Sequence, residues 1–89
     1  MPELIYTEGF IADVAQIRFG SKRNEIKRRV DLLSGFPELG SSNLPRSLVE
    51  QYGDTVRKMV VSPFLIVYEY HEDEDAVYLL GLIHQRSAW

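Results

Sequence analysis

Three runs of apolar and aromatic residues dominate the second half of the chain. They comprise Val56–Val61, Phe64–Tyr70 and Ala76–His84, and they are separated by Ser62-Pro63 and by the charged segment His71–Asp75. Val, Ile, Phe and Tyr favour strands, and connectors this short leave no room for a crossover helix. The pattern therefore predicts three consecutive antiparallel strands arranged as a meander.

Both faces of this predicted sheet are apolar. Side chains alternate between the two faces of a strand, and in residues 64–68 both alternating sets consist of large apolar residues. Strict alternation in the last strand groups on one face Tyr78, Leu80, Leu82 and His84. An antiparallel sheet with one side in water would carry polar residues on that side. We therefore expect both faces to be covered, one by helices and the other by residues 36–55 or by a partner protein.

The first third of the chain predicts a strand and two helices. Glu3–Tyr6 is expected to form a short strand, followed by Thr7 as a helix N-cap. Helical spacing of apolar residues predicts one helix that buries Phe10, Val14 and Ile17 and another that buries Ile26, Val30 and Leu33. Gly20 is expected to end the first helix in the left-handed conformation, and Ser21 to cap the second.

Residues 36–55 are the least regular part, because Pro37, Gly40 and Pro45 oppose a long helix or a central strand. One helical turn is expected at Leu48–Tyr52. A chain of 89 residues is expected to form a single domain, residues 1–89, of the α+β class. The expected architecture is an N-terminal strand, a helix hairpin and the three-stranded antiparallel meander, with the helices on one face of the sheet.

Composition narrows the functional classes. Apolar residues make up 45% and charged residues 26%, as in ordinary globular proteins, and the absence of cysteine rules out disulfides and thiolate chemistry. The N-terminal residues have neither a basic region nor a long apolar run, so we expect no signal peptide, no membrane span and a cytoplasmic location. The net charge of −3 argues against nucleic-acid binding by the whole surface, although six of the ten basic residues lie between Arg18 and Arg29.

The sequence contains no phosphate-binding glycine loop, no metal-spaced histidines and no nucleophile elbow. The segment His71–Asp75 offers ligand types that suit a metal ion. A run of acidic residues at the tip of a hairpin is more often only a solvated turn, and we favour that interpretation. We therefore expect neither a metal nor a cofactor.

Polar residues flank the predicted meander. Arg57 and Lys58 open its first strand, and His84, Gln85 and Arg86 close its last strand. If the outer strands flank the middle one, these side chains lie near one rim of the sheet. Histidine exchanges a proton near neutral pH and arginine binds phosphate, so such a rim could cleave an RNA backbone. In the alternative interpretation, the histidine is a hydrogen-bonded residue at a strand end and the arginines are solvated edge charges.

Four short sequence words follow the initial strand and helix hairpin, namely residues 36–40 (FPELG), 56–61 (VRKMVV), 64–68 (FLIVY) and 82–86 (LIHQR). In this order and spacing they resemble the RelE/ParE superfamily, the toxins of bacterial type II toxin–antitoxin modules. The resemblance implies a small sheet with a helix hairpin against it, and a cognate antitoxin that wraps the toxin in a hetero-oligomer. It implies one of two targets. RelE-like members are metal-independent endoribonucleases that cleave mRNA on the ribosome, and ParE-like members inhibit DNA gyrase.

The resemblance also suggests site residues. Lys58 and Arg86 match positions where RelE-like members often hold basic functional residues, and His84 and Arg86 match the HxR word that is common near the end of ParE-like members. These three residues are our candidate catalytic residues. Partner binding is expected at Arg57, Phe64, Leu65 and Trp89. Leu65 stands where many members carry an arginine in the middle strand. The expected function is a growth-inhibiting toxin with either target, and the alternative is a non-toxic binding module that keeps the fold and antitoxin binding but has lost activity.

Overall fold

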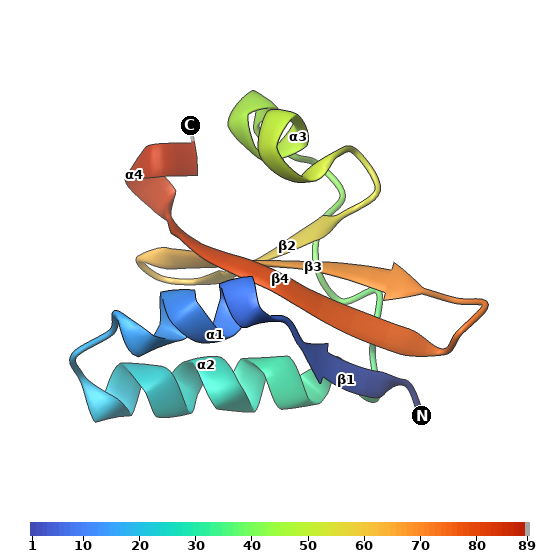
Figure 1. The fold of residues 1–89 in the computed structure, drawn as a ribbon, viewed down its shortest axis with the longest axis horizontal. Coiled ribbons are helices and arrows are strands. Elements are labelled where there is room, and N and C mark those ends of the chain that lie inside the picture. Colours follow the sequence, from blue (N-terminus) through green and yellow to red (C-terminus); the bar gives the residue numbers. More distant parts are fainter. Residues whose placement is uncertain (89) are drawn as a thin grey trace.

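The computed structural model describes residues 1–88, and within them one four-stranded sheet lies between two pairs of helices (Figure 1). The strands run in the order β1-β4-β3-β2, so β2, β3 and β4 form the expected antiparallel meander and β1 pairs in parallel with β4. The predicted α+β class is confirmed. The elements are β1 (Glu3–Tyr6), α1 (Glu8–Ala15), α2 (Gly20–Leu32), α3 (Arg46–Tyr52), β2 (Arg57–Val61), β3 (Phe64–His71), β4 (Ala76–His84) and α4 (Gln85–Ala88).

The helices α1 and α2 cover one face of the sheet (Figure 1). Thr7 is the N-cap of α1, as expected, and its hydroxyl accepts a hydrogen bond from the Phe10 N–H at 3.3 Å. Buried side chains on this face form the first core cluster. It contains Phe10, Ile17, Ile26, Val30, Leu33, Met59, Val61, Ile66, Tyr68, Val77, Leu79 and Leu82.

The short helices α3 and α4 cover the opposite face (Figure 1). The second core cluster lies there and contains Leu48, Val56, Leu65, Val67 and Ala88. The helix hairpin lies on one face as expected, and of the two expected ways of covering the other face the structure shows the first, residues 36–55, together with α4. Residues 36–55 form more structure than one turn, because α3 begins directly after Pro45, whose fixed backbone suits a helix start. The chain thus covers Leu65 and Val67 itself.

The connection between α1 and α2 also differs from the expectation. Gly20 is the first residue of α2, and Ser21 lies inside the helix. Phe19 is the N-cap, in an extended conformation, and its carbonyl oxygen accepts the N–H groups of Lys22 at 3.1 Å and Arg23 at 3.2 Å. The helix α1 ends at Ala15 without a left-handed residue, since its C-cap Gln16 is right-handed.

None of the helices within residues 1–88 combines the length and apolar content that a bilayer span requires.

A β-bulge in β4 changes which side chains share a face. Val67 pairs with Gly81, but its neighbour Tyr68 pairs with Leu79, so Leu80 is an extra residue in β4. Leu82 therefore joins Leu79 in the first core cluster, whereas strict alternation would have put it on the other face with Leu80. Every residue of β4 beyond the bulge changes face, including His84.

Two contacts fix the bulge in place. The strand β1 pairs with β4 only as far as Leu79, and beyond this point the carboxylate of Asp13 in α1 accepts the Leu82 N–H at 2.9 Å. On the opposite face, Tyr52 of α3 lies over Gly81, where an added Cβ would be 2.2 Å from the tyrosine hydroxyl. The absence of a side chain at Gly81 thus lets α3 approach the sheet.

Candidate functional site

The two candidate residues at the end of β4 lie side by side. His84 is exposed and pairs with Phe64, and the two rings meet edge to face with their centroids 5.7 Å apart. The Nδ1 atom of His84 accepts the backbone N–H of Arg86 at 3.2 Å. Among the described residues the guanidinium of Arg86 and the Nε2 atom of His84 have no partner. Both groups are therefore open to a ligand or a partner.

The helix α4 is tied to the turn between β2 and β3. The Gln85 N–H donates to the Pro63 carbonyl at 2.8 Å, and the Ser62 hydroxyl donates to the Gln85 side chain at 3.1 Å. From the other side, the Lys22 ammonium of α2 donates to the Ser62 carbonyl at 2.7 Å. Ala88 is buried in the second core cluster, and its carbonyl accepts the Ser47 hydroxyl. Arg86 is thus carried by a short helix with fixed ends.

Lys58 does not lie with these residues. It pairs with Val67, which belongs to the second core cluster, whereas Phe64, the partner of His84, packs against the first. Residues that pair across strands share a face, so Lys58 and His84 lie on opposite faces of the sheet. The strand register also separates Lys58 from His84 by three residues along the strands and by two strands across the sheet. Each of these separations corresponds to roughly 10 Å. The structure does not assemble the predicted catalytic trio.

The predicted partner residues have different environments. Leu65 is a core residue with 1% of its surface exposed, so it presents nothing to a partner. Phe64 is half-buried and borders a groove. The guanidinium of Arg57 donates to the Gly40 carbonyl at 2.8 Å and lies 3.9 Å from the Glu38 carboxylate, so it holds residues 38–40 against β2. Trp89 lies outside the described residues.

The loop that Arg57 holds is also anchored by Tyr68. The hydroxyl of this fully buried tyrosine accepts the Gly40 N–H at 2.8 Å, and burial raises the pKa of Tyr68 above 10.0. A Cβ at Gly40 would lie 2.7 Å from the Lys58 carbonyl, so no larger residue fits there. Ser41 then exchanges two backbone hydrogen bonds with Lys58, at 2.8 and 2.9 Å. The middle of the β2 edge is therefore covered by the chain itself.

Sequence reasoning missed a groove at the end of the sheet where α1 turns into α2. We call it the turn groove. It has a volume of about 550 Å³, and Asp13, Arg18, Phe19, Lys22 and Phe64 are among the residues that line it. Phe19 is 74% exposed, which is unusual for a phenylalanine. The Arg18-Phe19 pair was expected at the end of the first helix, directly before Gly20, but it lies in the connection between α1 and α2.

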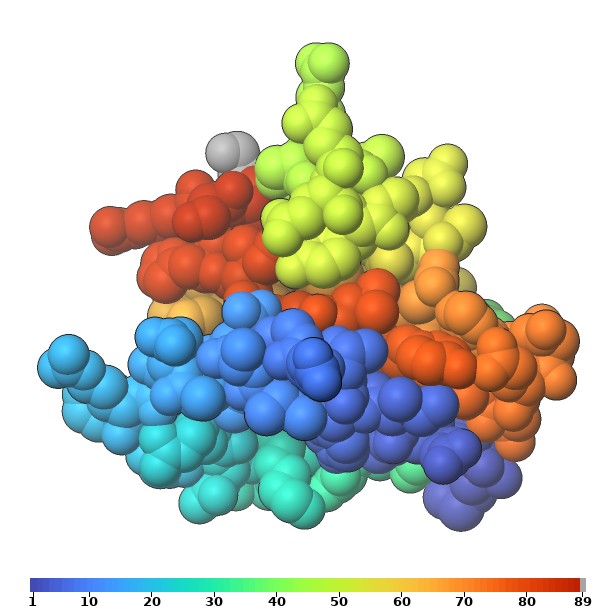
Figure 2. Space-filling model, in the orientation of Figure 1, coloured from blue at the N-terminus to red at the C-terminus, as the bar shows by residue number. Residues whose placement is uncertain are grey.

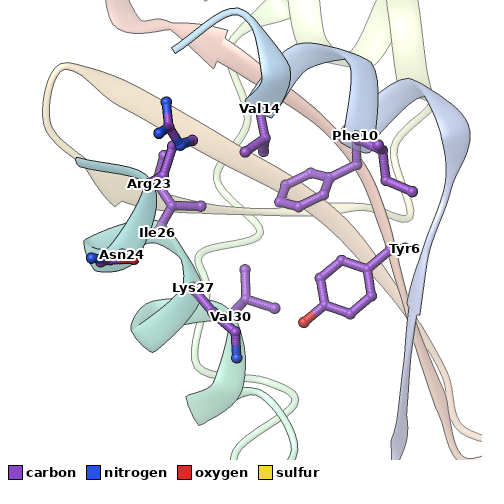
Figure 3. A pocket seen from close by; sticks show the side chains of 9 residues that line it. Tyr6, Phe10, Val14, Arg23, Asn24, Ile26, Lys27 and Val30 are labelled. Carbon is purple, nitrogen blue, oxygen red and sulfur yellow. The ribbon is translucent and has the colours of Figure 1, made fainter. Parts of the chain in front are cut away.

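A second concavity lies between α1 and α2. We call it the hairpin groove, and it has a volume of about 310 Å³. Figure 3 shows Tyr6, Phe10 and Val14 on one side, facing Ile26 and Val30 on the other. Polar side chains at its border come from α2, namely Arg23, Asn24 and Lys27. The groove is thus apolar inside and positively charged along one border.

The acidic turn is an ordered cluster. His71 lies between two carboxylates, with Nε2 2.7 Å from Glu69 and Nδ1 3.0 Å from Glu74. These hydrogen bonds raise the pKa of His71 above 6.5, because both carboxylates stabilise the charged imidazolium. His71, Asp73 and Glu74 also have ligand atoms within 4.8 Å of one another, which is compatible with a cation. Because both ring nitrogens already contact carboxylates, ion pairing within the turn explains the cluster without a metal.

The fold is similar to those of solved RelE-type toxins. A chain of the E. coli RelBE toxin–antitoxin complex is 12% identical, with a TM-score of 0.70 over 94% of this chain and 96% of the other. A chain of the RelBE2 complex from Mycobacterium tuberculosis is 15% identical, with a TM-score of 0.75 over 94% and 99%. The isolated E. coli RelE toxin is 14% identical, with a TM-score of 0.71 over 94% and 84%. No protein of curated function matches the sequence significantly.

The sequence itself matches one family over nearly its whole length. The match extends from Leu4 in β1 to the last residue, and the family is described as the ParE toxin of the type II toxin–antitoxin system, parDE. The solved RelE-type chains share the same arrangement of helices and strands, as the TM-scores show. The chain therefore belongs to the ParE toxin family and is a toxin of the RelE/ParE superfamily from a type II toxin–antitoxin system.

Proposed function

We propose that this toxin arrests growth by binding DNA gyrase, as ParE-like members do, and that it does not cleave RNA. The observation that carries the proposal is the placement of Lys58 and His84 on opposite faces of the sheet. Cleavage of an RNA backbone needs a base at the 2′-hydroxyl and a cation at the phosphate, both touching the same few atoms. Because gyrase acts on the chromosome, the toxin would act in the cytoplasm.

The middle strand supports the same choice. Leu65 stands where many members of the superfamily carry an arginine, and here it is buried under α3 and α4. A phosphate therefore finds no guanidinium on this strand. His84 and Arg86 remain together and exposed, which suits recognition of a partner as well as it would suit chemistry. Inhibition by binding needs only such a surface.

The test separates the two targets directly. The chain is induced in bacteria, the 5′ ends of mRNA are mapped, and the purified chain is added to a DNA supercoiling reaction with purified gyrase. We expect inhibited supercoiling, double-strand breaks and no new mRNA ends within reading frames. New ends on ribosome-bound messages with unaffected supercoiling would contradict the proposal. Normal growth on induction, with no effect on supercoiling, would favour the alternative of a binding module that has lost activity.

For the antitoxin, we propose the hairpin groove as the main binding site. The similar chains from E. coli and M. tuberculosis come from complexes named as toxin–antitoxin pairs, which supports a hetero-oligomer here too. The groove between α1 and α2 is apolar inside, and Ile11 at its border is 55% exposed. Arg23 and Lys27 lie along the other border. An amphipathic antitoxin helix with acidic residues beside its apolar stripe fits both features.

Substitution of Ile11 by glutamate tests this site without disturbing the core, because the side chain is largely exposed. We expect Ile11→Glu to weaken antitoxin binding by roughly 10-fold or more, since it places a charge in an apolar contact and opposes the acidic partner. Leu39→Glu is the matched control, because Leu39 is 51% exposed and lies outside the groove. Calorimetry with the purified antitoxin measures both affinities. Equal affinities of the two variants would show that the hairpin groove is not the antitoxin-binding site.

A further inference from the structure

The turn groove lies at the end of the molecule where three segments meet. In Figure 2 the connection between α1 and α2 and the last helix border the same end of the molecule, with the turn between β2 and β3 between them. Phe64 from β3 lines the groove, and its ring contacts the ring of His84 edge to face. Phe19 projects from the connection with 74% of its surface exposed. A large exposed aromatic ring beside an apolar groove is typical of an interaction surface.

The charges around the groove are mostly positive and partly unsatisfied. Among the described residues, the guanidinium of Arg18 has no hydrogen-bond or ion-pair partner, and the same holds for Arg86. The two acids nearby are engaged within the fold. Asp13 accepts the Leu82 N–H at 2.9 Å, and Glu25 binds the Lys22 ammonium at 2.7 Å. The surface therefore offers two free arginines to a partner, although the protein as a whole is acidic.

We propose that the turn groove, together with the neighbouring His84 and Arg86, is the surface by which the toxin binds its target, and that it takes an acidic protein segment anchored by one apolar side chain. This inference rests on the proposed gyrase function. The apolar anchor enters between Phe19 and Phe64, and its flanking carboxylates bind Arg18 in the groove and Arg86 next to it, which is linked to Phe64 through His84.

A nucleic-acid strand fits the groove less well. The carboxylate of Asp13 lines the groove, and a nucleic-acid backbone, which carries a negative charge at every nucleotide, would place phosphates beside it; a peptide can instead place its apolar side chain there and its carboxylates at the border. Phe64 already meets the ring of His84 edge to face, so it is less available as a stacking platform for bases. Positive charge at the border and apolar surface inside instead match an acidic peptide with a hydrophobic anchor.

The turn groove is distinct from the hairpin groove, because the two share no lining residue. Substitutions in one are therefore expected to leave binding at the other largely intact. This separation allows loss of target binding to be distinguished from unfolding: a variant that still binds the antitoxin with normal affinity is folded.

The test uses the purified full chain and purified gyrase, with inhibition of supercoiling and direct binding as readouts. The variants are Phe19→Ser and Arg18→Glu, and their matched controls are Phe36→Ser and Arg28→Glu. Phe36 is also a highly exposed phenylalanine, at 63%, and Arg28 lies on the exposed side of α2. We expect each groove variant to require roughly 10-fold more protein for half-inhibition, while the controls match the wild type and all four retain antitoxin affinity. Raised salt should weaken binding of the wild type more than that of Arg18→Glu.

The outcomes are distinguishable. If the wild type does not inhibit gyrase, the proposed function fails. If the wild type inhibits and Phe19→Ser and Arg18→Glu inhibit equally well, the proposed function stands and the turn groove is not the target surface. A third outcome would overturn the inference. The wild type would bind a single-stranded DNA oligonucleotide but not DNA-free gyrase, and Phe19→Ser and Arg18→Glu would abolish the DNA binding. The ligand of the groove would then be a nucleic acid and not an acidic protein segment.

Discussion

His84 meets Phe64 edge to face across β3 and β4, with the ring centroids 5.7 Å apart and the ring planes at 79°. The bulge at Leu80 creates this contact, because it moves the end of β4 by one residue relative to β3. Without the extra residue, His84 would lie on the face that carries Lys58. The bulge therefore decides that the two candidate residues are apart and that His84 borders the turn groove.

Truncation of Phe64 tests how much this contact stabilises the end of the sheet. Phe64→Ala removes a half-buried ring that packs against the first core cluster and forms the edge-to-face pair. We expect a loss of about 1–3 kcal/mol in the free energy of unfolding, less than for a fully buried phenylalanine. Urea denaturation measures it. Phe36→Ala, at an exposed position, should change stability by no more than about 0.5 kcal/mol.

Restoring an arginine to the middle strand should not restore a phosphate site. Leu65→Arg would place an unpaired charge among Leu48, Val67 and Ala88, and we expect it to cost on the order of 3–5 kcal/mol, enough to unfold a domain of this size. The control is Val60→Arg. Val60 pairs with Leu65 across the strands but is 45% exposed, so this variant should fold normally. Circular dichroism and thermal unfolding compare them. A stable Leu65→Arg protein would mean that α3 and α4 leave this face readily.

The approach of α3 to β4 depends on Gly81. We expect Gly81→Ala to destabilise the protein by about 1–3 kcal/mol, because the new methyl group would overlap the Tyr52 hydroxyl. In the background of Tyr52→Leu the same substitution should cost much less, since the overlapping atoms are gone. A double-mutant cycle of urea midpoints measures this coupling. Additive effects of the two substitutions would show that the cost of the added methyl group does not come from its overlap with Tyr52.

The cluster around His71 predicts a pH-dependent contribution to stability. Hydrogen bonds to Glu69 and then Glu74 raise the pKa of His71 above 6.5, its usual value in an unfolded chain. The stabilisation is therefore fully present below pH 6.5 and is lost as the pH rises through the higher folded-state pKa. The pKa of Glu69 is lowered by the Thr55 hydroxyl and by His71, so its contribution is present above pH 4.5 and lost as the pH falls through the folded-state pKa.

The measurement is the difference in urea midpoint between the wild type and His71→Gln at several pH values. We expect this difference to shrink as the pH is raised from near neutral through the folded-state pKa of His71. Because the cluster is partly exposed, added salt should reduce the difference at the lower pH values. A difference that stays constant over this range would show that His71 contributes through packing against Tyr78, 4.5 Å away, and not through charge.

Much of the fold follows from the sequence. The runs rich in Val, Ile and Tyr and the short connectors between them suffice to predict the meander, because strand preference and connector length are local properties. The N-cap at Thr7 is local in the same sense. The start of α2 could not be predicted from local residues. Phe19 is its N-cap without a side-chain hydrogen bond, and the guanidinium of Arg23 donates to the Ile17 carbonyl. Such long-side-chain contacts leave no signature in a capping pattern.

The site was less predictable for a physical reason. The sequence by itself determined that His84 and Arg86 are neighbours, since they are two residues apart, and that both faces of the sheet must be covered. Only the tertiary structure decided that α3 and α4 cover Leu65, and that one extra residue at Leu80 turns His84 away from Lys58. The bulge is fixed by Asp13 of α1 and by Tyr52 of α3, from elements far away in the chain, so no local pattern in β4 could reveal it.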